Sequence, residues 1–200
     1  MICDPPPGSW PVASTTEQFK NRLITVRTDS VRMPDGQHAD RTVVSHIGAV
    51  AVLALDDADR VLMIRQYRHP AGRELWEIPA GLRDVDGEAM VETARRELAE
   101  ETGHAAREWH ALLDSYASPG IGTERIRIFL ARGLAPVETD YEREGEEKFL
   151  RTEWVPLDDA VAAGLAGQLH NGATLQGILA AAVARGQGFA GLRAADAPET

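Results

Sequence analysis

Residues 81–103 read GLRDVDGEAMVETARRELAEETG, and the rest of the chain is best interpreted outward from this stretch. Glu97, Glu100 and Glu101 place three carboxylates within five positions of a predicted helix. Residues four apart in a helix differ by about 40° around the axis and lie about 6 Å apart along it, so Glu97 and Glu101 share a face. Like charges at this spacing repel each other, so helix stability alone does not favour the pattern. A divalent cation that needs hard oxygen ligands would favour it.

The apolar residues of the same stretch support the helix. Val91, Ala94 and Leu98 recur at three- and four-residue intervals and form a stripe offset from the acidic face. Gly103 follows as a natural terminator, because glycine adopts a left-handed C-cap at little cost. A solvated acidic face is the alternative interpretation, and it is the usual role of an isolated E-x-x-E-E pattern.

The full spacing resembles the signature of the Nudix hydrolases, which is a glycine, a glutamate and then R-E-hydrophobe-x-E-E-x-G. These places are filled here by Gly81, Glu88, Arg96, Glu97, Leu98, Glu100, Glu101 and Gly103. The chain departs from the pattern twice. Six residues rather than five separate Gly81 from Glu88, and His104 stands where the family has a hydrophobic residue.

The resemblance implies a metal site and the residues that hold it. The implied ligands are the carbonyl of Ala80 and the carboxylates of Glu97, Glu100 and Glu101. The implied ion is Mg²⁺, with Mn²⁺ as an alternative. The resemblance implies about two or three ions per site. Structural roles are implied for Gly81, in the loop before the helix, for Glu88 paired with Arg96, and for Gly103.

Composition limits the classes of partner. The net charge of −10 argues against a nucleic-acid backbone as partner, because binding to it needs a basic surface. Cys3 is the single cysteine, so an internal disulfide is excluded and a reducing compartment is expected. No signal peptide is recognisable at the start and no apolar run is long enough to span a bilayer. We therefore expect a cytoplasmic protein that binds no membrane.

The pattern along the chain predicts an α/β protein with a small N-terminal β appendage. We expect a flexible arm at 1–15, the N-terminal β region at 16–45 around a turn at 34–36, the main domain at 46–188 and a flexible tail at 189–200. Expected strands lie at 47–55, 61–67, 109–113, 125–130 and 149–155, and expected helices at 157–166 and 173–185. The resemblance implies a mixed sheet sandwiched between helices.

Two further stretches of the sequence are similar to those of ADP-ribose pyrophosphatases. The first consists of residues 65–68 (RQYR) and 76–81 (WEIPAG), which match the Q-Y-R … W-E-x-P-A-G run of these enzymes. Arg68 is a candidate ligand of a substrate phosphate, because a guanidinium binds phosphate through a planar fork. An exposed surface arginine is the alternative. Glu77 is a candidate substrate-binding residue or a structural partner of such an arginine.

A second segment carries further substrate-binding candidates. Pro119 lies sixteen residues after Gly103, where ADP-ribose-hydrolysing members have a proline. Pro119 and Gly120 would form a fixed turn at one wall of the substrate pocket. Glu124 matches the position at which relatives bind the hydroxyls of the terminal ribose.

The catalytic base is implied to lie on the acidic segment 138–147. The resemblance places a glutamate there, just before the strand that reaches Pro156, and Glu147 and Glu146 both fit. A solvated acidic loop is the alternative for most of this segment. With the metal ligand Glu101, these glutamates form the expected catalytic set.

The implied reaction is the Mg²⁺-dependent hydrolysis of the diphosphate bond of ADP-ribose to AMP and ribose 5-phosphate. One alternative is another nucleoside diphosphate-X, such as a nucleotide sugar or a dinucleotide, and another is a non-catalytic sensor of such ligands. Phe19, Trp10 and Tyr67 are candidates for stacking on adenine, although packing in a core is the more common role for each. The family's N-terminal β region contributes to a partner's site, so a homodimer is expected.

Overall fold

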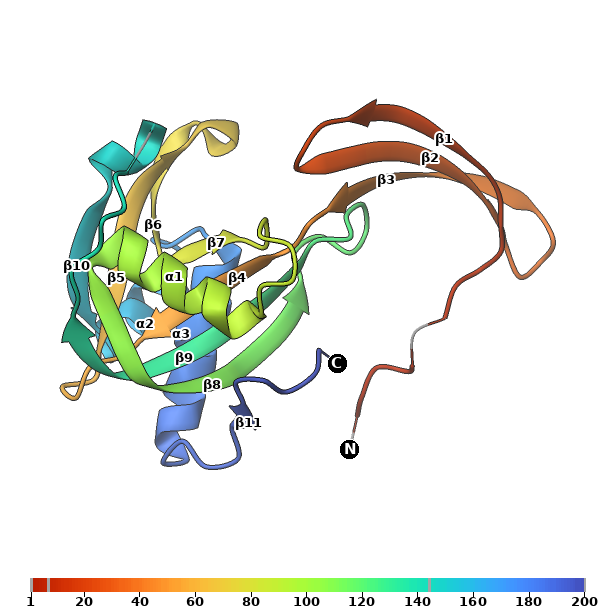
Figure 1. The fold of residues 1–200 in the computed structure, drawn as a ribbon. Helices are drawn as coiled ribbons and strands as arrows, with labels where there is room; N and C mark the ends of the chain where they lie inside the picture. The colour runs from red at the N-terminus through yellow and green to blue at the C-terminus, as the bar shows by residue number, and fades with distance from the viewer. Residues whose placement is uncertain (1, 7, 144, 200) are drawn as a thin grey trace. The chain divides into compact units, whose positions relative to one another are not determined.

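The computed structural model describes residues 2–6, 8–143 and 145–199, apart from the side chain of Glu146. These residues form two compact units (Figure 1). The smaller unit consists of Met1–Ile47 together with Ser118–Glu124, and the larger consists of Gly48–Ala117 together with Arg125–Thr200.

The smaller unit is built on a three-stranded antiparallel sheet in the order β1-β2-β3. Its strands are β1 (Val12–Lys20), β2 (Ile24–Arg32) and β3 (His38–His46). The expected turn joins β2 to β3, where the N–H of Gly36 donates to the carbonyl of Met33 at 2.9 Å. The prediction of an arm through residue 15 was wrong, because β1 already begins at Val12 and pairs with β2.

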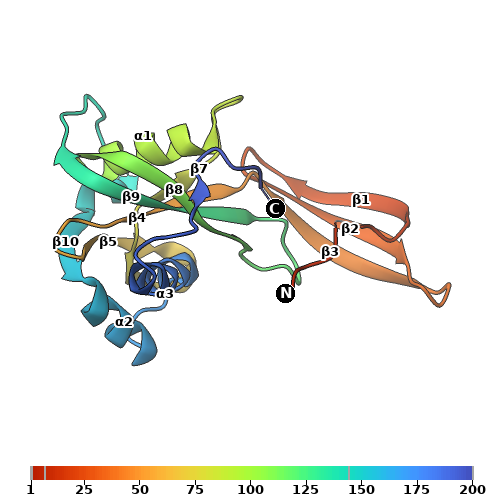
Figure 2. The same ribbon diagram turned by 90° about the horizontal axis from the view of Figure 1, so that it is seen from below.

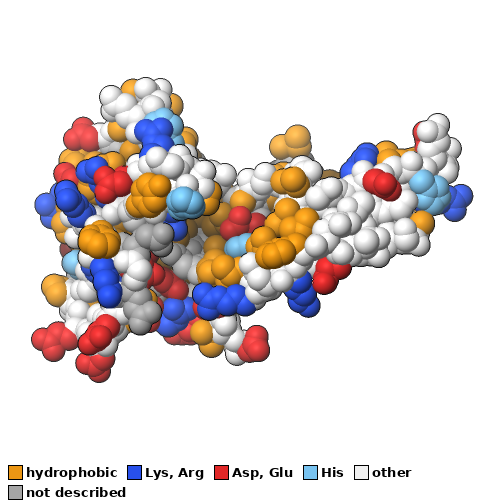
Figure 3. All heavy atoms as spheres, turned by 90° about the horizontal axis from the view of Figure 1, so that it is seen from above, with side chains coloured by type: hydrophobic (Ala, Val, Ile, Leu, Met, Phe, Trp, Pro, Cys, Tyr) orange, Lys and Arg blue, Asp and Glu red, His pale blue; other side chains and the backbone are white. Residues whose placement is uncertain are grey.

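Apolar side chains are exposed on the smaller unit, as Figure 3 shows. Trp10, Val12 and Phe19 are each about half exposed, and every residue of β1 is exposed. A polar, exposed strand such as β1 lacks the alternation that marks a half-buried strand, which is why the sequence did not reveal it.

The larger unit contains two sheets. One has five strands in the order β11-β8-β9-β4-β7, and the other has three in the order β10-β5-β6. Only β4 and β9 pair in parallel among the named strands that the structure describes. The strands are β4 (Ala49–Ala54), β5 (Arg60–Arg68), β6 (Arg73–Glu77), β7 (Ala80–Leu82), β8 (His104–Tyr116), β9 (Arg125–Pro136), β10 (Arg151–Pro156) and β11 (Arg193–Ala194).

Helices cover both faces of the five-stranded sheet, as seen in Figure 2. On one face, Ala94 and Leu98 of the first helix pack on Val52 and neighbouring residues, and on the other, Ile178 of the third helix packs on Leu53. The helices are α1 (Met90–Thr102), α2 (Leu157–Leu165) and α3 (Gly172–Gly186), with 3-10 turns η1 (His69–Ala71) and η2 (Gly145–Phe149). The expected mixed sheet between helices is confirmed.

Two local expectations differ from the structure. Gly81 lies in β7, paired with Val50, rather than in a loop. The tail expected to be flexible contains β11, and the carbonyls of Ala197 and Pro198 accept hydrogen bonds from Arg127. Arg127 itself is only 1% exposed, because Asp114 on β8 pairs with it at 2.6 Å. These pairings join residues far apart in sequence, so no local pattern signals them. No helix of the described chain is long and apolar enough to cross a membrane.

Helix α3 also fixes the segment that precedes β7. Asn171 caps the helix, since its side chain accepts a hydrogen bond from the N–H of Thr174 at 2.9 Å. The fully buried hydroxyl of Thr174 then accepts from the N–H of Ile78 at 3.0 Å. This contact positions the chain two residues before Ala80, where β7 meets α1.

Candidate active site

Helix α1 orients the acidic residues through its apolar side. Ala94 and Leu98 are fully buried, so the rotation of the helix about its axis is fixed by packing. Gly103 ends the helix in the left-handed conformation, with φ of 67°, as the sequence predicts. Glu97 and Glu101 therefore emerge together toward β7.

Glu101 is a buried carboxylate. It is 5% exposed, and its Oε2 accepts a hydrogen bond from the backbone N–H of Ala80 at 2.9 Å. Burial is the main cause that raises the pKa of Glu101, to about 8, with repulsion from Glu97 and Glu147 adding to it. The hydrogen bond from Ala80 and the charge of Arg68 oppose this shift. Glu97, Glu147 and Arg68 thus lie close enough to Glu101 for their charges to change its pKa.

Glu97 lies directly against Gly81. A β-carbon added at Gly81 would be 1.9 Å from Cδ of Glu97, so only glycine leaves room for this carboxylate. Burial raises the pKa of Glu97 to about 7, against the lowering effect of Arg96, and the charges of Glu100 and Glu147 raise it further. The glycine of the motif is explained by this close approach rather than by a turn.

Arg96 joins the helix to the segment before it. Its guanidinium contacts Glu88 at 3.3 Å, Glu97 at 2.7 Å and Glu100 at 3.2 Å. The Arg96 hydrogen bond is the main cause that holds the pKa of Glu88 below its ordinary value, and the hydroxyl of Thr93 also donates to Glu88 at 2.8 Å. The expected pairing of Glu88 with Arg96 is confirmed.

Arg68 and Glu77 form a two-point ion pair. Nε and Nη2 of Arg68 donate to the two oxygens of Glu77 at 2.9 and 2.7 Å. Glu77 is 1% exposed, whereas the side chain of Arg68 is partly exposed. This geometry favours the role of Glu77 as the structural partner that orients Arg68, and phosphate binding by Arg68 stays a prediction.

The acidic segment 138–147 brings Glu147 to the glutamates of α1. The charge of Glu147 contributes to the raised pKa values of both Glu97 and Glu101. The hydroxyl of Tyr141 donates to Oε2 of Glu147 at 2.7 Å. Glu147 therefore lies near these glutamates, and its role as the base stays a prediction, whereas the side chain of Glu146 lies outside the described residues.

Sequence reasoning missed two residues of this segment. Tyr141 is the hydrogen-bond donor to Glu147, and Arg143 donates to the backbone carbonyls of Glu100 and Glu101 at 3.3 and 2.6 Å. Apart from the two candidates for the base, the abundance of carboxylates in the segment suggested a solvated loop. A sharper signal was the presence of one arginine and one tyrosine among so many acids.

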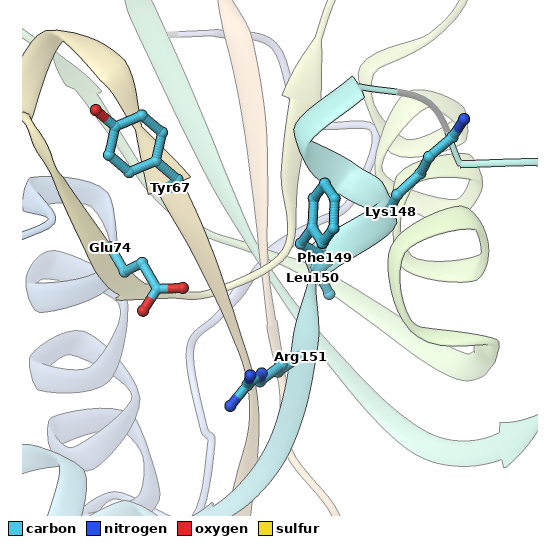
Figure 4. Close-up of a pocket in the computed structure, with 6 residues that line it drawn as sticks. All are labelled: Tyr67, Glu74, Lys148, Phe149, Leu150 and Arg151. Atoms are coloured by element: carbon cyan, nitrogen blue, oxygen red, sulfur yellow. The ribbon is translucent and has the colours of Figure 1, made fainter.

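A pocket of about 690 Å³ opens between β5, β6 and η2. Figure 4 shows the rings of Tyr67 and Phe149 on opposite sides of it. Tyr67, a candidate for stacking on adenine, thus lines this pocket together with Glu74 and Arg151. The other two aromatic candidates, Trp10 and Phe19, belong to the smaller unit.

Three predicted substrate residues also belong to the smaller unit. Pro119 and Gly120 form the expected turn, in which the N–H of Ile121 donates to the carbonyl of Ser118 at 3.0 Å. The carboxylate of Glu124 lies 3.5 Å from Nδ1 of His46. The structure therefore groups these residues with the three-stranded sheet, and Arg68, Glu77 and the glutamates of α1 with the larger unit.

The donor chemistry of the larger unit's cluster fits a divalent ion. In the described part of the chain, no three acidic or histidine side chains already converge on one point as a closed metal site. Glu97 and Glu100 each give one oxygen to Arg96 instead. A carboxylate has a second oxygen, and buried carboxylates that repel one another gain most from a nearby cation. Hard oxygens of this kind are the ligands that Mg²⁺ prefers.

Two protein-family profiles match the chain. The NUDIX domain matches residues 45–174, and the nucleoside diphosphate sugar hydrolase N-terminal domain matches residues 10–44. The second match ends just before the first begins, near the end of β3. Together they account for both the three-stranded sheet and most of the larger unit.

Two relatives are similar to this chain over most of its length. The ADP-ribose pyrophosphatase of Mycobacterium tuberculosis is 44% identical over 158 residues, which are 79% of this chain and 76% of that protein. The ADP-ribose pyrophosphatase of Bacillus subtilis is 38% identical over 72% of this chain and 76% of its own length. A crystal structure of an ADP compounds hydrolase has the same fold, with a TM-score of 0.76 over 90% of this chain and 97% of that one, at 21% identity.

Proposed function

The chain belongs to the Nudix family and is a hydrolase of nucleoside diphosphate compounds, and from this premise we propose that its substrate is ADP-ribose. The products would be AMP and ribose 5-phosphate. The observation that carries the proposal is the convergence of Glu97, Glu101 and Glu147, two of them with strongly raised pKa values, beside Arg68. Relatives named for ADP-ribose hydrolysis support the choice of substrate.

We infer that the cofactor is Mg²⁺, held by Glu97, Glu100, Glu101 and the carbonyl of Ala80. When bound, on the order of two or three such ions would neutralise the diphosphate and lower the pKa of an attacking water. Gly81 lets Glu97 approach the backbone, and Arg96 keeps Glu97 and Glu100 on the same side of the helix. Mn²⁺ is the alternative cation, since it shares the preference for oxygen ligands.

Glu147 is proposed as the general base. It stands apart from helix α1 on its own segment, so it can accept a proton from water while the helix glutamates hold cations. Arg68, oriented by Glu77, is proposed to bind a phosphate oxygen as substrate enters. Pro119, Gly120 and Glu124 are proposed to bind the ribose end, which rests on their match to the family's pattern.

A nucleotide sugar is the second candidate substrate. The match of residues 10–44 to the N-terminal domain of nucleoside diphosphate sugar hydrolases favours it. The Nudix fold and its metal-binding glutamates would serve either substrate equally well.

A substrate panel with product analysis tests the proposal. Purified protein is incubated with Mg²⁺ and ADP-ribose, ADP-glucose, GDP-mannose or a diadenosine polyphosphate, and products are separated by ion-exchange chromatography. We expect the highest kcat/KM for ADP-ribose, with AMP and ribose 5-phosphate in equal amounts. A nucleotide sugar cleaved faster than ADP-ribose would reject the proposed substrate, and tight binding of ADP-ribose without cleavage would indicate a sensor.

A further inference from the structure

The segment that carries Glu147 is tied to the C-terminal end of helix α1. Nη2 of Arg143 donates to the carbonyl oxygen of Glu101 at 2.6 Å, and its Nε donates to that of Glu100 at 3.3 Å. The last carbonyls of a helix have no partner within the helix, and this end of the helix dipole attracts a cation. The side chain of Arg143 therefore supplies both the hydrogen-bond donors for these carbonyls and the positive charge that this end of the helix attracts.

The contact is made on the helical turn whose side chains form the acidic cluster. Glu100 and Glu101 accept from Arg143 through their backbones, while their carboxylates point toward Arg96 and Ala80. The position of the segment is thus set directly against the residues with which Glu147 must act. A contact elsewhere on the helix would not fix this relation.

Tyr141 provides a second contact, to Glu147 itself. Its hydroxyl donates to Oε2 of Glu147 at 2.7 Å. This hydrogen bond is the main cause that raises the pKa of Tyr141 to about 12, with burial and the charge of Glu147 adding to it. The phenol therefore remains a protonated donor at neutral pH, and it leaves the other oxygen of Glu147 for another partner.

These contacts counteract a repulsion. Glu147 carries the same charge as Glu97 and Glu101, and the segment 138–147 contains further carboxylates. Like charges would drive such a segment away from the helix in the absence of an attachment. Arg143 is the only cation of that segment, and the structure places it on the helix.

We propose that Arg143 and Tyr141 are positioning residues for hydrolysis, in which Arg143 holds the segment on α1 and Tyr141 orients Glu147 toward the glutamates of the helix. The inference rests on the proposed role of Glu147 as general base. Neither residue touches the reacting atoms in this scheme. Their removal should therefore slow the chemical step while leaving substrate binding nearly unchanged.

The test uses Arg143→Met, Arg143→Lys and Tyr141→Phe in the full chain. Arg107→Met is the matched control for the arginine variants. Arg107 is exposed on β8, and its side chain has no hydrogen bond or ion pair among the described residues. Tyr116→Phe is the control for tyrosine, because its hydroxyl likewise has no hydrogen-bond partner in the described part of the chain. Kinetics are measured on whichever compound of the substrate panel the wild type cleaves fastest.

We expect Arg143→Met to lower kcat on the order of 10²-fold, because a displaced catalytic group costs about this much, with little change in KM. Tyr141→Phe should lower kcat by about 10-fold, since it removes one hydrogen bond to a charged group. Arg143→Lys should recover part of the loss, because a lysine can still donate to one carbonyl. Both controls should match the wild type.

Hydrogen exchange of the free protein supplies a readout that does not depend on the substrate. Amides of Gly145–Phe149 should exchange about 10-fold faster in Arg143→Met than in the wild type or in Arg107→Met. Wild-type kcat in Arg143→Met, or unchanged exchange in this segment, would overturn the inference. If ADP-ribose is not the preferred compound, the proposed substrate fails while the same variants still decide the positioning role.

Discussion

Glu101 combines burial, negative charge and two acidic neighbours in one side chain. A charged carboxylate in this setting lowers the stability of the fold unless it is protonated or joined by a cation. Among the described residues, the backbone N–H of Ala80 is the hydrogen-bond donor to Glu101. The residue is therefore unfavourable for the stability of the metal-free protein and suited to metal binding. We expect this conflict to show in both activity and stability.

Replacing Glu101 with glutamine should abolish most of the activity without unfolding the protein. The substitution removes the charge and keeps the size, and the loss of several kcal/mol of transition-state stabilisation corresponds to a decrease in kcat/KM on the order of 10²–10³-fold. Glu92→Gln is the control, because Glu92 is exposed on the same helix and pairs only with Arg95 among the described residues. Near-normal turnover by Glu101→Gln would contradict a role in metal binding.

The metal-free protein should become less stable as the pH rises through 7 to 8. The pKa of Glu97 is raised to about 7 and that of Glu101 to about 8, from an ordinary value of 4.5, so folding favours their protonated forms. Their stabilising contribution is complete in acid, below the ordinary value, and is lost as the pH rises through the raised values. Melting temperatures in EDTA should show this decline in the wild type and less of it in Glu101→Gln.

Magnesium provides the complementary measurement. Added Mg²⁺ at about pH 8 should raise the melting temperature of the wild type, because a ligand that binds only the folded state stabilises it. It should have little effect on Glu101→Gln. Equal pH dependence in EDTA and equal responses to Mg²⁺ in the two proteins would show that Glu101 is not a metal ligand.

Individual residues of the cluster were predictable where the motif spacing is fixed. The pairing of Glu88 with Arg96 follows from that spacing, as does the shared face of Glu97 and Glu101. Tyr141 and Arg143 were not predictable, because their partners lie on Glu147 and on backbone atoms of α1 that a sequence does not display.

At the level of elements, helix α1 was the most predictable part of the chain. Its apolar stripe and its terminal Gly103 are local signals, and both are found as expected. Strand β7 was missed because its pairing with β4 joins residues about thirty positions apart, and three residues carry too little pattern to reveal a strand. The burial of Arg127 was not predictable, because its partner Asp114 lies on another strand.

Helix α3 and strand β7 should be coupled through Thr174. Thr174→Val removes the hydroxyl that accepts from the buried N–H of Ile78, so this donor is left without its partner. Such a loss costs about 1–3 kcal/mol of unfolding free energy. Thr174→Ser keeps the hydroxyl and should lose less. Urea denaturation at 25 °C measures both, and equal stability of the valine variant and the wild type would refute the coupling.

The division of the whole molecule into two units was predictable from the sequence, but the boundaries of the smaller unit were predicted only in part. The N-terminal β region was expected to end at residue 45, and the smaller unit extends to Ile47. The inclusion of Ser118–Glu124 in that unit was not foreseen, because it depends on a bridge between Val44 and Gly122. Contacts between segments this far apart leave no trace in the local sequence.

The smaller unit should mediate a homodimer. Its sheet exposes all of β1 and the apolar side chains of Trp10, Val12 and Phe19, which is a surface typical of an interface. Light scattering should therefore give a mass twice that of the chain, and Phe19→Glu should weaken the dimer. A fully active monomer would be inconsistent with this expectation.

Locating the metal ions crystallographically is the decisive observation. Crystals soaked with Mn²⁺ and a non-hydrolysable methylene analogue of ADP-ribose would be measured near the manganese absorption edge. We predict anomalous peaks at the carboxylates of Glu97 and Glu101, with the diphosphate of the analogue bound to the same ions. Analogue bound in the absence of any peak at these two residues would contradict the proposed mechanism.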